Sequence, residues 1–298
     1  MKLTVIVLTY NHESFIRQTL ESIICQKTNF EIEIIISDDG SSDKTIEIIE
    51  DVRRNSIVKI IPIYNDKNKG VLKNALGVFS SITGQYLAVV DGDDFWNFDG
   101  KLQQQVDFLD TNIVYAGCFH DTKIISDSNA SSSLFYGANN YSDIYKYRQD
   151  IYPADIIKRL ILPTSSIVLR TSFLNSFDFS VLKDNYSIVW KLTCFAIYKS
   201  KFYYFNNVWS TYRNHLKGIS KSNNIKFHQS HILFLESLSK NKNFENNLLD
   251  IFNSLSIEYK IVIEREVNKN RKLKKVFYNY IKSECKRIFY FYKSIFIK

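Results

Sequence analysis

Proline and glycine are scarce in this chain of 298 residues, which contains 3 prolines and 9 glycines. Collagen-like, linker-rich and low-complexity disordered proteins need far more of both, so these classes are excluded. Hydrophobic residues make up 45% of the chain and charged residues 23%, as in ordinary globular proteins. The length suffices for one large domain, or for one domain with an appendage.

Long apolar segments and paired cysteines are also lacking. No window approaches the roughly 18 uninterrupted apolar residues of a membrane-spanning helix. The apolar run near the N-terminus is too short for a signal peptide. Cys25, Cys118, Cys194 and Cys285 lie far apart without a CxxC pair, so neither a zinc site nor a disulfide framework is indicated. We expect reduced, buried cysteines in a cytoplasmic protein, or in one that is peripheral on the inner face of the cytoplasmic membrane.

The excess of positive charge belongs to the C-terminal segment. Residues 269–298 hold ten Lys or Arg and one acid, Glu284, which sums to +9, so residues 1–268 carry 8 − 9 = −1 of the total of +8. Residues 271–298 also contain Phe and Tyr at helical spacing, which suits an anionic membrane surface at about 1 kcal/mol per cation. A solvated coiled segment is the plainer alternative. We expect no nucleic acid partner, because no nucleic-acid-binding motif accompanies this segment.

Two periodicities alternate over the first hundred residues. Apolar runs at 3–9, 32–36, 57–63 and 85–90 are typical of strands that are covered on both faces. Helical spacing follows them at 12–27, 44–54, 71–82 and 101–110. Strands that alternate with helices predict a parallel sheet, whose ligands bind beyond the carboxyl ends of the strands. Those ends carry the polar segments 9–11, 38–40 and 91–94.

The pattern is less regular after residue 110. Residues 126–150 are rich in Ser, Asn and Tyr and predict a long loop. Helices are predicted at 153–161, 186–199 and from 224 onward, and strands at 165–170, 202–205 and 208–212. We expect approximate boundaries between structural regions near residues 110 and 222.

The strongest local feature is the segment DGDDFW at 91–96. Its three carboxylates repel one another, and a divalent cation would remove that penalty. Mg²⁺ or Mn²⁺ prefers one or two carboxylates together with phosphate oxygens and water. Gly92 permits the bend and a close approach of a ligand. A solvated acidic turn is the alternative, which the position after a buried strand disfavours.

Several segments in order resemble the family 2 glycosyltransferases with the GT-A fold. They are VIVLTYNHESFIRQTLESI, IIISDDGSSDKT, the NKG of 68–70, DGDDFW, KLQQQVDFLD and YRNH, and they cover about the first 220 residues. The resemblance implies an α/β fold with a Rossmann-like, mostly parallel sheet flanked by helices. Residues 1–110 would form the nucleotide-sugar-binding half and 111–222 the acceptor-binding half, with 223–298 as a helical, basic extension.

The same resemblance implies a donor site. Asp38 or Asp39 would bind the nucleobase, most simply uracil, beside a wall with Tyr10 placed to stack. Asp91 would contact the sugar or ribose, and Lys69 and Lys73 the diphosphate. The full donor set is Thr9, Tyr10, Asn11, Glu13, Asp38, Asp39, Lys69, Lys73, Asp91, Asp93 and Arg213. Capping of the helix at 44–54 is the alternative for Asp38 and Asp39, and a plain surface position is the alternative for the lysines.

The resemblance also implies a metal and a base. Asp93, Asp94 and His215 would hold Mg²⁺ or Mn²⁺ on the diphosphate. Asp184 would take the proton of the acceptor hydroxyl, although an N-cap of the helix at 186–199 is its alternative. Residues 163–166 lie where acceptor contacts are expected.

The activity expected from these residues is inverting transfer of a sugar from a UDP-sugar to a hydroxyl of a glycan or lipid-linked saccharide. A nucleotidyltransferase that forms sugar nucleotides is one alternative, but TYNHES stands where it needs a Gly- and Arg-rich loop. An inactive membrane-associated scaffold on the same fold is another. The sequence leaves a homo-oligomer open.

Overall fold

The computed structural model describes most of the chain. The described residues are 1–126, 129–135, 149–152, 162–177, 179, 182, 188–215, 224–239 and seven positions between 253 and 264. The first half contains β1 (Leu3–Thr9), α1 (Ile16–Ile24), β2 (Ile32–Asp38), α2 (Thr45–Asn55), β3 (Lys59–Tyr64), α3 (Val71–Phe79), β4 (Tyr86–Asp91), β5 (Phe95–Trp96), α4 (Lys101–Thr111) and β6 (Tyr115–Ser126). It is followed by β7 (Asn129–Leu134), β8 (Asp150–Ile151), the 3₁₀ turn η1 (Thr164–Ser166), β9 (Val168–Arg170), the 3₁₀ turn η2 (Thr171–Ser176), α8 (Ile188–Lys199), β10 (Lys201–Asn214) and α9 (Asn224–Ser239).

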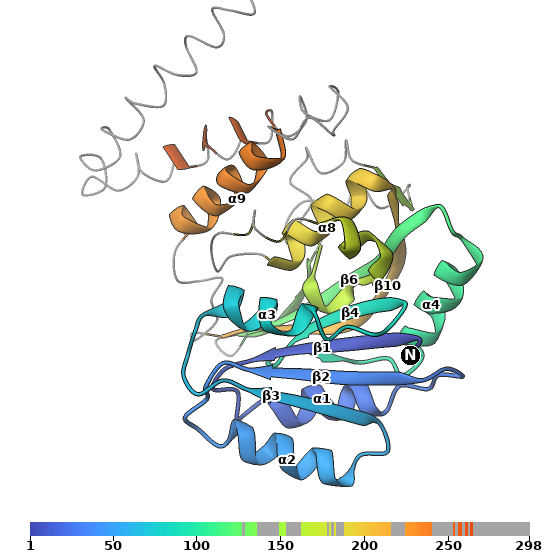
Figure 1. Ribbon diagram of the computed structural model, residues 1–298, viewed down its shortest axis with the longest axis vertical. Coiled ribbons are helices and arrows are strands. Elements are labelled where there is room, and N and C mark those ends of the chain that lie inside the picture. The colour runs from blue at the N-terminus through green and yellow to red at the C-terminus, as the bar shows by residue number, and fades with distance from the viewer. Residues whose placement is uncertain are drawn as a thin grey trace, which may run out of the picture.

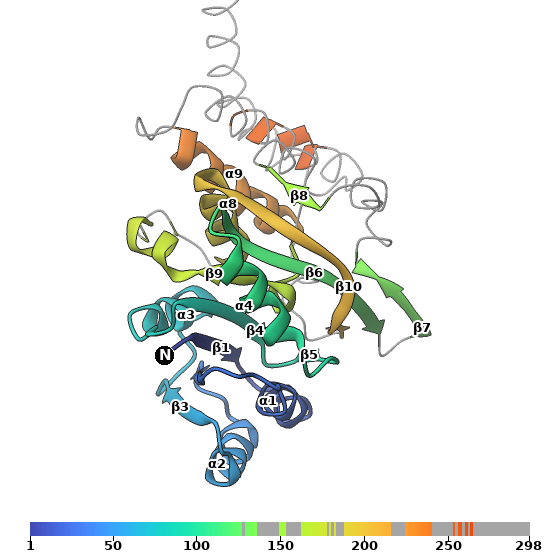
Figure 2. The ribbon, with the colours of Figure 1, turned by 90° about the vertical axis from the view of Figure 1, so that its right-hand side faces the viewer.

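The described strands form one sheet with the order β3-β2-β1-β4-β9-β6-β10-β5 (Figures 1 and 2). The pairs β3–β2, β2–β1, β1–β4 and β6–β10 are parallel. The short β9 is antiparallel to both β4 and β6, so these two strands run in the same direction. The carboxyl ends of β1, β2, β4 and β6 therefore meet at one edge of the sheet.

Helices cover both faces of the sheet, which explains the unbroken apolar strands. All seven residues of β1 and all seven of β2 are buried. One face packs on the apolar stripes of α1, α2 and α4. The other face packs on α3 and α8. Burial on two sides is what a continuous Val- and Ile-rich run predicts.

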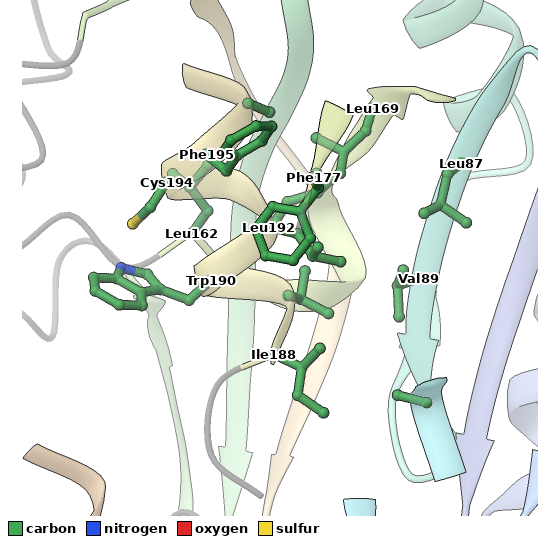
Figure 3. Close-up of a cluster of buried hydrophobic side chains, with 14 of the residues drawn as sticks. Leu87, Val89, Leu162, Leu169, Phe177, Ile188, Trp190, Leu192, Cys194 and Phe195 are labelled. Carbon is green, nitrogen blue, oxygen red and sulfur yellow. The ribbon is translucent and has the colours of Figure 1, made fainter. Parts of the chain in front are cut away.

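Helix α8 packs on the half of the sheet that contains β4, β9 and β6. Leu192 and Phe195 of α8 join Leu87 and Val89 of β4 in one buried cluster (Figure 3). In the same view Ile188, the first residue of α8, lies toward the Val89 end of β4. The N-terminal end of α8 thus faces the carboxyl edge of the sheet.

Several predictions on the second half of the chain were wrong. Residues 129–134 form β7, which pairs with β6 as a hairpin, where a loop was expected over 126–150. β10 is a single strand, because register shifts between Phe205 and Ser210 absorb the polar residues between the two expected strands. Only 168–170 of the expected strand 165–170 forms a paired strand, since residues 164–166 form a 3₁₀ turn. The expected helix at 153–161 lies outside the described residues.

The cysteine and membrane predictions have mixed outcomes. Cys118 and Cys194 are buried thiols, as expected, and Cys285 lies outside the described residues. Cys25 is exposed, because it caps the C-terminus of α1 away from the buried stripe of Ile16, Leu20 and Ile23. Within the described part of the chain, no helix combines the length and apolar character needed to cross a bilayer.

Candidate functional site

The polar ends of three parallel strands lie side by side. Thr9 at the end of β1 pairs with Asp38 at the end of β2, and Leu8 pairs with Asp91 at the end of β4. Thr9 is 3% exposed and Asp38 is fully buried, so these two side chains lie beneath the surface at this edge of the sheet. The structure thus brings together the three polar segments that the sequence places after separate strands.

The turn after β4 is tied to β1 and α1 by its backbone. The Gly92 N–H donates to the Leu8 carbonyl at 2.8 Å, which continues the sheet by one bond. The Thr19 hydroxyl contacts the carbonyl oxygens of Gly92 and Asp94 at 2.9 and 2.6 Å. The Trp96 N–H then donates to Ser22 Oγ at 3.1 Å. These contacts hold the segment 91–96 against α1 at both ends.

Glycine is required at position 92 by the close approach of β1. A Cβ at Gly92 would lie 2.7 Å from His12 Nδ1 and 2.8 Å from Thr9 Cβ. We expect Gly92→Ala to destabilise the protein by about 1–3 kcal/mol, because such overpacking displaces neighbours. Thermal unfolding of the purified variant measures this loss.

The matched control for that substitution is Gly77→Ala in α3. A Cβ at Gly77 meets nothing within 4 Å, and alanine is favoured over glycine in a helix by roughly 0.5–1 kcal/mol. Gly77→Ala should therefore leave the melting temperature unchanged or raise it. If Gly92→Ala were equally harmless, the turn would have to be looser than these distances indicate.

Two histidines that are far apart in the sequence approach the Asp93 carboxylate. His215, just after β10, has its Nε2 atom 2.9 Å from Asp93 Oδ2. His12, just after β1, has its Nε2 atom 3.8 Å from the same oxygen, and its Nδ1 lies 3.2 Å from Thr9 Oγ1. Burial lowers the pKa of His12, although the neighbouring Asp93 opposes this, so that ring is neutral at pH 7.

The other two acids of the turn are under electrostatic strain. Burial raises the pKa of Asp91 to about 7, and the charge of Asp93 adds to the effect. Burial and the charges of Asp93 and Asp91 raise the pKa of Asp94 in the same way. Asp94 is 2% exposed and accepts the backbone N–H of Arg213 at 3.1 Å, so it also joins the turn to β10. The predicted mutual repulsion of these carboxylates is thus present in the structure.

Arg213 contacts the backbone of the turn that contains Asp93. Its guanidinium donates to the Asp93 carbonyl oxygen and to Gln18 Oε1. It also lies 5.1 Å from the ring centroid of Phe15 and 4.6 Å from that of Phe95, within the range of cation–π attraction. These contacts make Arg213 a support of the backbone at 93, and its predicted contact with phosphate stays a prediction.

Asp38 and Asp39 organise two different loops. Asp38 accepts the N–H and the hydroxyl of Ser41 at 2.8 and 2.5 Å. Asp39 accepts the N–H groups of Lys69 and Gly70 at 2.8 and 2.9 Å, directly before α3. The structure thus gives both carboxylates partners other than the start of α2, which was the alternative to base binding.

The start of α2 is held by Asn11, Glu13 and Asp43 instead. Glu13 Oε2 accepts the Lys44 N–H at 3.0 Å, and Asp43 Oδ1 accepts the Thr45 N–H at 3.0 Å. Asn11 adopts a φ of 54° and accepts the Ser42 N–H at 2.9 Å. Asn11 and Glu13 therefore fix the loop between β2 and α2. Their predicted contact with the donor stays untested.

The remaining predicted residues differ in what the structure shows of them. Tyr10 is 42% exposed beside this edge, as a stacking surface must be. Lys69 donates to Asn65 Oδ1 at 2.8 Å, and Lys73 is exposed on the first turn of α3. Asp184 and the basic segment 271–298 lie outside the described residues, so their roles stay predictions.

His12 is the residue that the sequence reasoning missed. It belongs to the quoted segment TYNH, and its signal was its place directly after a buried strand. A histidine there was indistinguishable from any surface histidine until the fold brought it to Asp93. Only the long-range contact between the ends of β1, β4 and β10 reveals the cluster.

The cluster suits a hard divalent cation that arrives with a phosphate ligand. Among the described residues no group of three or more His, Cys, Asp or Glu side chains could hold a metal alone. Asp93 and His215, with atoms 2.9 Å apart, offer an oxygen and a nitrogen ligand. Mg²⁺ and Mn²⁺ are commonly held by one or two carboxylates, with phosphate oxygens and water in the other positions. The residues present fit such an ion.

Known proteins share this sequence pattern and this fold. Residues 4–178, more than half of the chain, match the family described as Glycosyl transferase family 2. An Escherichia coli protein named UDP-Glc:alpha-D-GlcNAc-diphosphoundecaprenol beta-1,3-glucosyltransferase WfaP is 35% identical over 112 residues, which are 38% of this chain and 43% of the relative. The chain spans about half the length of the curated relatives it matches.

Solved structures agree in fold at low sequence identity. S. aureus TarS in complex with UDP-GlcNAc has a TM-score of 0.65 at 19% identity, over 85% of this chain and 72% of that chain. The mannosyltransferase PcManGT from Pyrobaculum calidifontis, solved with GDP-Man and Mn²⁺, has a TM-score of 0.61 at 14% identity, over 90% of this chain and 75% of that chain. The expected fold class is confirmed, and the chain belongs to glycosyl transferase family 2 and has the GT-A fold.

Proposed function

We propose that this protein is an inverting glycosyltransferase that moves a sugar from a UDP-sugar to a hydroxyl of a glycan or lipid-linked saccharide. The observation that carries the proposal is the convergence of Asp91, Asp93 and His215 at the carboxyl edge of the parallel sheet. Ligands of open α/β sheets bind at this edge. The E. coli relative, named as a UDP-Glc transferase with a lipid-linked acceptor, and TarS with its UDP-GlcNAc support the choice of donor and acceptor class.

The donor is assigned to the region 1–110 of the chain and the acceptor to 111–222. On the donor side Asp38 and Asp39 at the end of β2 receive the base, with Tyr10 beside it. Asp91 receives a sugar or ribose hydroxyl, and Lys69 and Lys73 add positive charge for the diphosphate. The described carboxylates Asp38 and Asp39 also order the loops at 41 and 70, so they would present the base site without further rearrangement.

Asp93 and His215 would hold the Mg²⁺ or Mn²⁺. Asp94, the third predicted ligand, is buried and accepts the Arg213 backbone N–H, so we assign it instead to bracing the turn. When bound, the ion supplies Lewis-acid charge to the diphosphate leaving group. PcManGT, solved with Mn²⁺ and GDP-Man, supports a divalent ion in this fold. Asp184 takes the proton of the acceptor hydroxyl as the hydroxyl oxygen attacks the anomeric carbon of the donor sugar. Attack on the side opposite the nucleotide inverts that carbon.

Thermal protection by nucleotides tests the donor assignment without a known acceptor. The protein is heated with UDP, GDP, dTDP and their common sugars, each with Mn²⁺ and with EDTA. We expect UDP and one UDP-sugar to raise the melting temperature only with Mn²⁺, since a ligand at 100 times its Kd stabilises by about 2.7 kcal/mol.

Three other outcomes would redirect the proposal. Protection by GDP or dTDP would correct the base. Protection by a nucleoside triphosphate, with pyrophosphate released on adding a sugar phosphate, would favour the nucleotidyltransferase. Protection by none of these nucleotides, with or without metal, would contradict a nucleotide-sugar enzyme and favour the inactive scaffold.

A further inference from the structure

A group of buried polar side chains lies behind the segment 91–96, apart from the site described above. Lys101 and Gln105 come from α4, His120 from β6 and Ser165 from η1. Each is at most 1% exposed. Lys101 Nζ, Gln105 Oε1, His120 Nε2 and Ser165 Oγ are buried without a hydrogen-bond partner among the protein groups described. Such atoms are rare in native proteins, and each requires a physical explanation.

Lys101 and Ser165 contact the Trp96 indole, and Gln105 contacts the neighbouring Ser166. Lys101 Nζ lies 4.1 Å from the Trp96 ring centroid. The indole Nε1 of Trp96 donates to the Ser165 carbonyl oxygen at 2.7 Å. Gln105 Nε2, one turn along α4 from Lys101, donates to the Ser166 carbonyl oxygen at 2.9 Å. Lys101, Gln105 and Ser165 are thus linked through direct contacts with Trp96 or within η1, whereas His120 is not.

His120 joins the group from the sheet. Burial lowers its pKa, and the charge of Lys101 adds to this effect. The thiol of Cys118, two residues earlier on β6, lies 3.6 Å from Gln105 Nε2. His120 and Cys118 point to the same face of the sheet because strand residues two apart share a face. That face is the one that α4 covers.

The hydrogen-bonding roles of the four atoms can be assigned. His120 Nδ1 lies 2.7 Å from the Asp121 carbonyl oxygen, which can only accept, so Nδ1 carries the proton and Nε2 of the neutral ring is an acceptor. Gln105 Oε1 is a second acceptor. Protonated Lys101 offers three N–H donors, and Ser165 offers one donor and an acceptor. The group therefore has donors and acceptors that do not reach one another directly.

Water is the ligand that suits this mixture. An anion would face the lone pairs of Gln105 and His120, and a metal cation would face the ammonium of Lys101. Burial lowers the pKa of Lys101 to about 7, and within the described chain no carboxylate forms an ion pair with it, so the charged form gains little from protein charges and depends on solvation. A water molecule accepts from Lys101 and donates to either acceptor. Buried waters typically make about three such bonds to otherwise unsatisfied groups.

We propose that Lys101, Gln105, His120 and Ser165 bind ordered internal water, and that Lys101 hydrated in this way positions Trp96 and with it the turn that carries Asp93. The water solvates the ammonium where no counter-charge does, and the ammonium holds the indole face. Trp96 is 4% exposed, with its backbone N–H on Ser22 Oγ and its indole N–H on the Ser165 carbonyl oxygen. Because the side chain is packed on all sides, a shift of the indole displaces the backbone at the end of the turn. Lys101 is thus a positioning residue, and the inference holds whatever sugar the protein transfers.

A crystal structure of the full chain that resolves ordered waters tests the site itself. We expect density for at least one water within hydrogen-bond distance of Lys101 Nζ and of two of the three other atoms. The proposal would be overturned if ordered waters were resolved elsewhere in the protein interior but none lay beside these four side chains. This readout needs neither substrate nor activity, so its failure cannot be confused with failure of the proposed function.

Fluorine NMR of protein labelled with 5-fluorotryptophan tests the positioning role. The chain has three tryptophans, and Trp96→Phe assigns the Trp96 resonance. We expect Lys101→Met, which keeps the aliphatic stem and removes the charge, to shift the Trp96 resonance and to abolish the water. Lys27→Met is the matched control, because this lysine is 81% exposed and pairs with Asp99 at the surface. It should leave all three resonances in place.

An unmoved Trp96 resonance in folded Lys101→Met would overturn the positioning role. Should that variant fail to fold, Ser165→Ala takes its place, since it removes one hydroxyl and keeps the ammonium. Its expected result is the loss or displacement of the water bonded to position 165 and a smaller shift of the Trp96 resonance. An unchanged water position and an unchanged resonance in Ser165→Ala would count against the proposal.

Discussion

We expect Asp93→Asn to abolish sugar transfer while leaving the fold intact. In the unchanged protein, Asp93 Oδ2 lies 2.9 Å from His215 Nε2 and 3.8 Å from His12 Nε2. Asparagine keeps the shape but removes the charge that would neutralise a divalent ion. Lewis-acid stabilisation of the leaving group amounts to several kcal/mol, so we expect kcat/KM to fall by about 10²-fold or more. Initial rates with the UDP-sugar found by thermal protection measure the loss.

A surface carboxylate provides the matched control. Asp107 is exposed on α4, where it accepts a hydrogen bond from Gln103, so Asp107→Asn removes one acidic charge far from the turn. Its rate should equal that of the unchanged protein. Asp93→Asn should also lose the Mn²⁺-dependent part of the protection by UDP. Turnover that survives both the substitution and treatment with EDTA would contradict the metal role.

The first half of the fold could be predicted because its signals are local. β1, β2 and β4 are runs of apolar residues buried on both faces, while the edge strand β3 is partly buried, and a helical stripe follows each of the four. That alternation indicates a parallel sheet, and a parallel sheet places the ends of β1, β2 and β4 at one edge. Thr9, Asp38 and Asp91 could thus be grouped without coordinates.

The second half was less predictable because its strands depend on partners. β7 has the sequence NASSSL, which lacks an apolar run, and it is a strand because it pairs with the end of β6. β10 passes through Asn206 and Asn207 with register shifts that no periodicity indicates. The approach of His12 and His215 to Asp93 joins the ends of three strands, so it could only be seen once the sheet was assembled.

The partners of the acidic residues also lay beyond reach of sequence reasoning. Asp39 and Gly70 are 31 positions apart, yet the carboxylate accepts the N–H of the residue that precedes α3. Capping of the nearer helix was the reasonable local alternative, and Glu13 and Asp43 perform it instead.

Asp184→Asn should abolish turnover and keep nucleotide binding. Asp184 lies outside the described residues, but Ile188, four positions later, begins α8 and packs in the cluster that contains Val89 of β4. Because the N-terminal end of α8 faces the carboxyl edge (Figure 3), a base that precedes this helix would serve the site from the acceptor side. Loss of a general base lowers kcat by about 10²–10⁴-fold.

The choice of asparagine separates the base from a helix cap. Asparagine and aspartate cap helices about equally well, whereas alanine costs about 1 kcal/mol. If Asp184 is the base, Asp184→Asn loses turnover with an unchanged melting temperature and unchanged protection by UDP and Mn²⁺. If it is only a cap, Asp184→Asn keeps its rate and Asp184→Ala melts at a lower temperature. A rate near that of the unchanged protein in Asp184→Asn would move the search for the base to another carboxylate on the acceptor side, since proton transfer from the attacking hydroxyl still requires one.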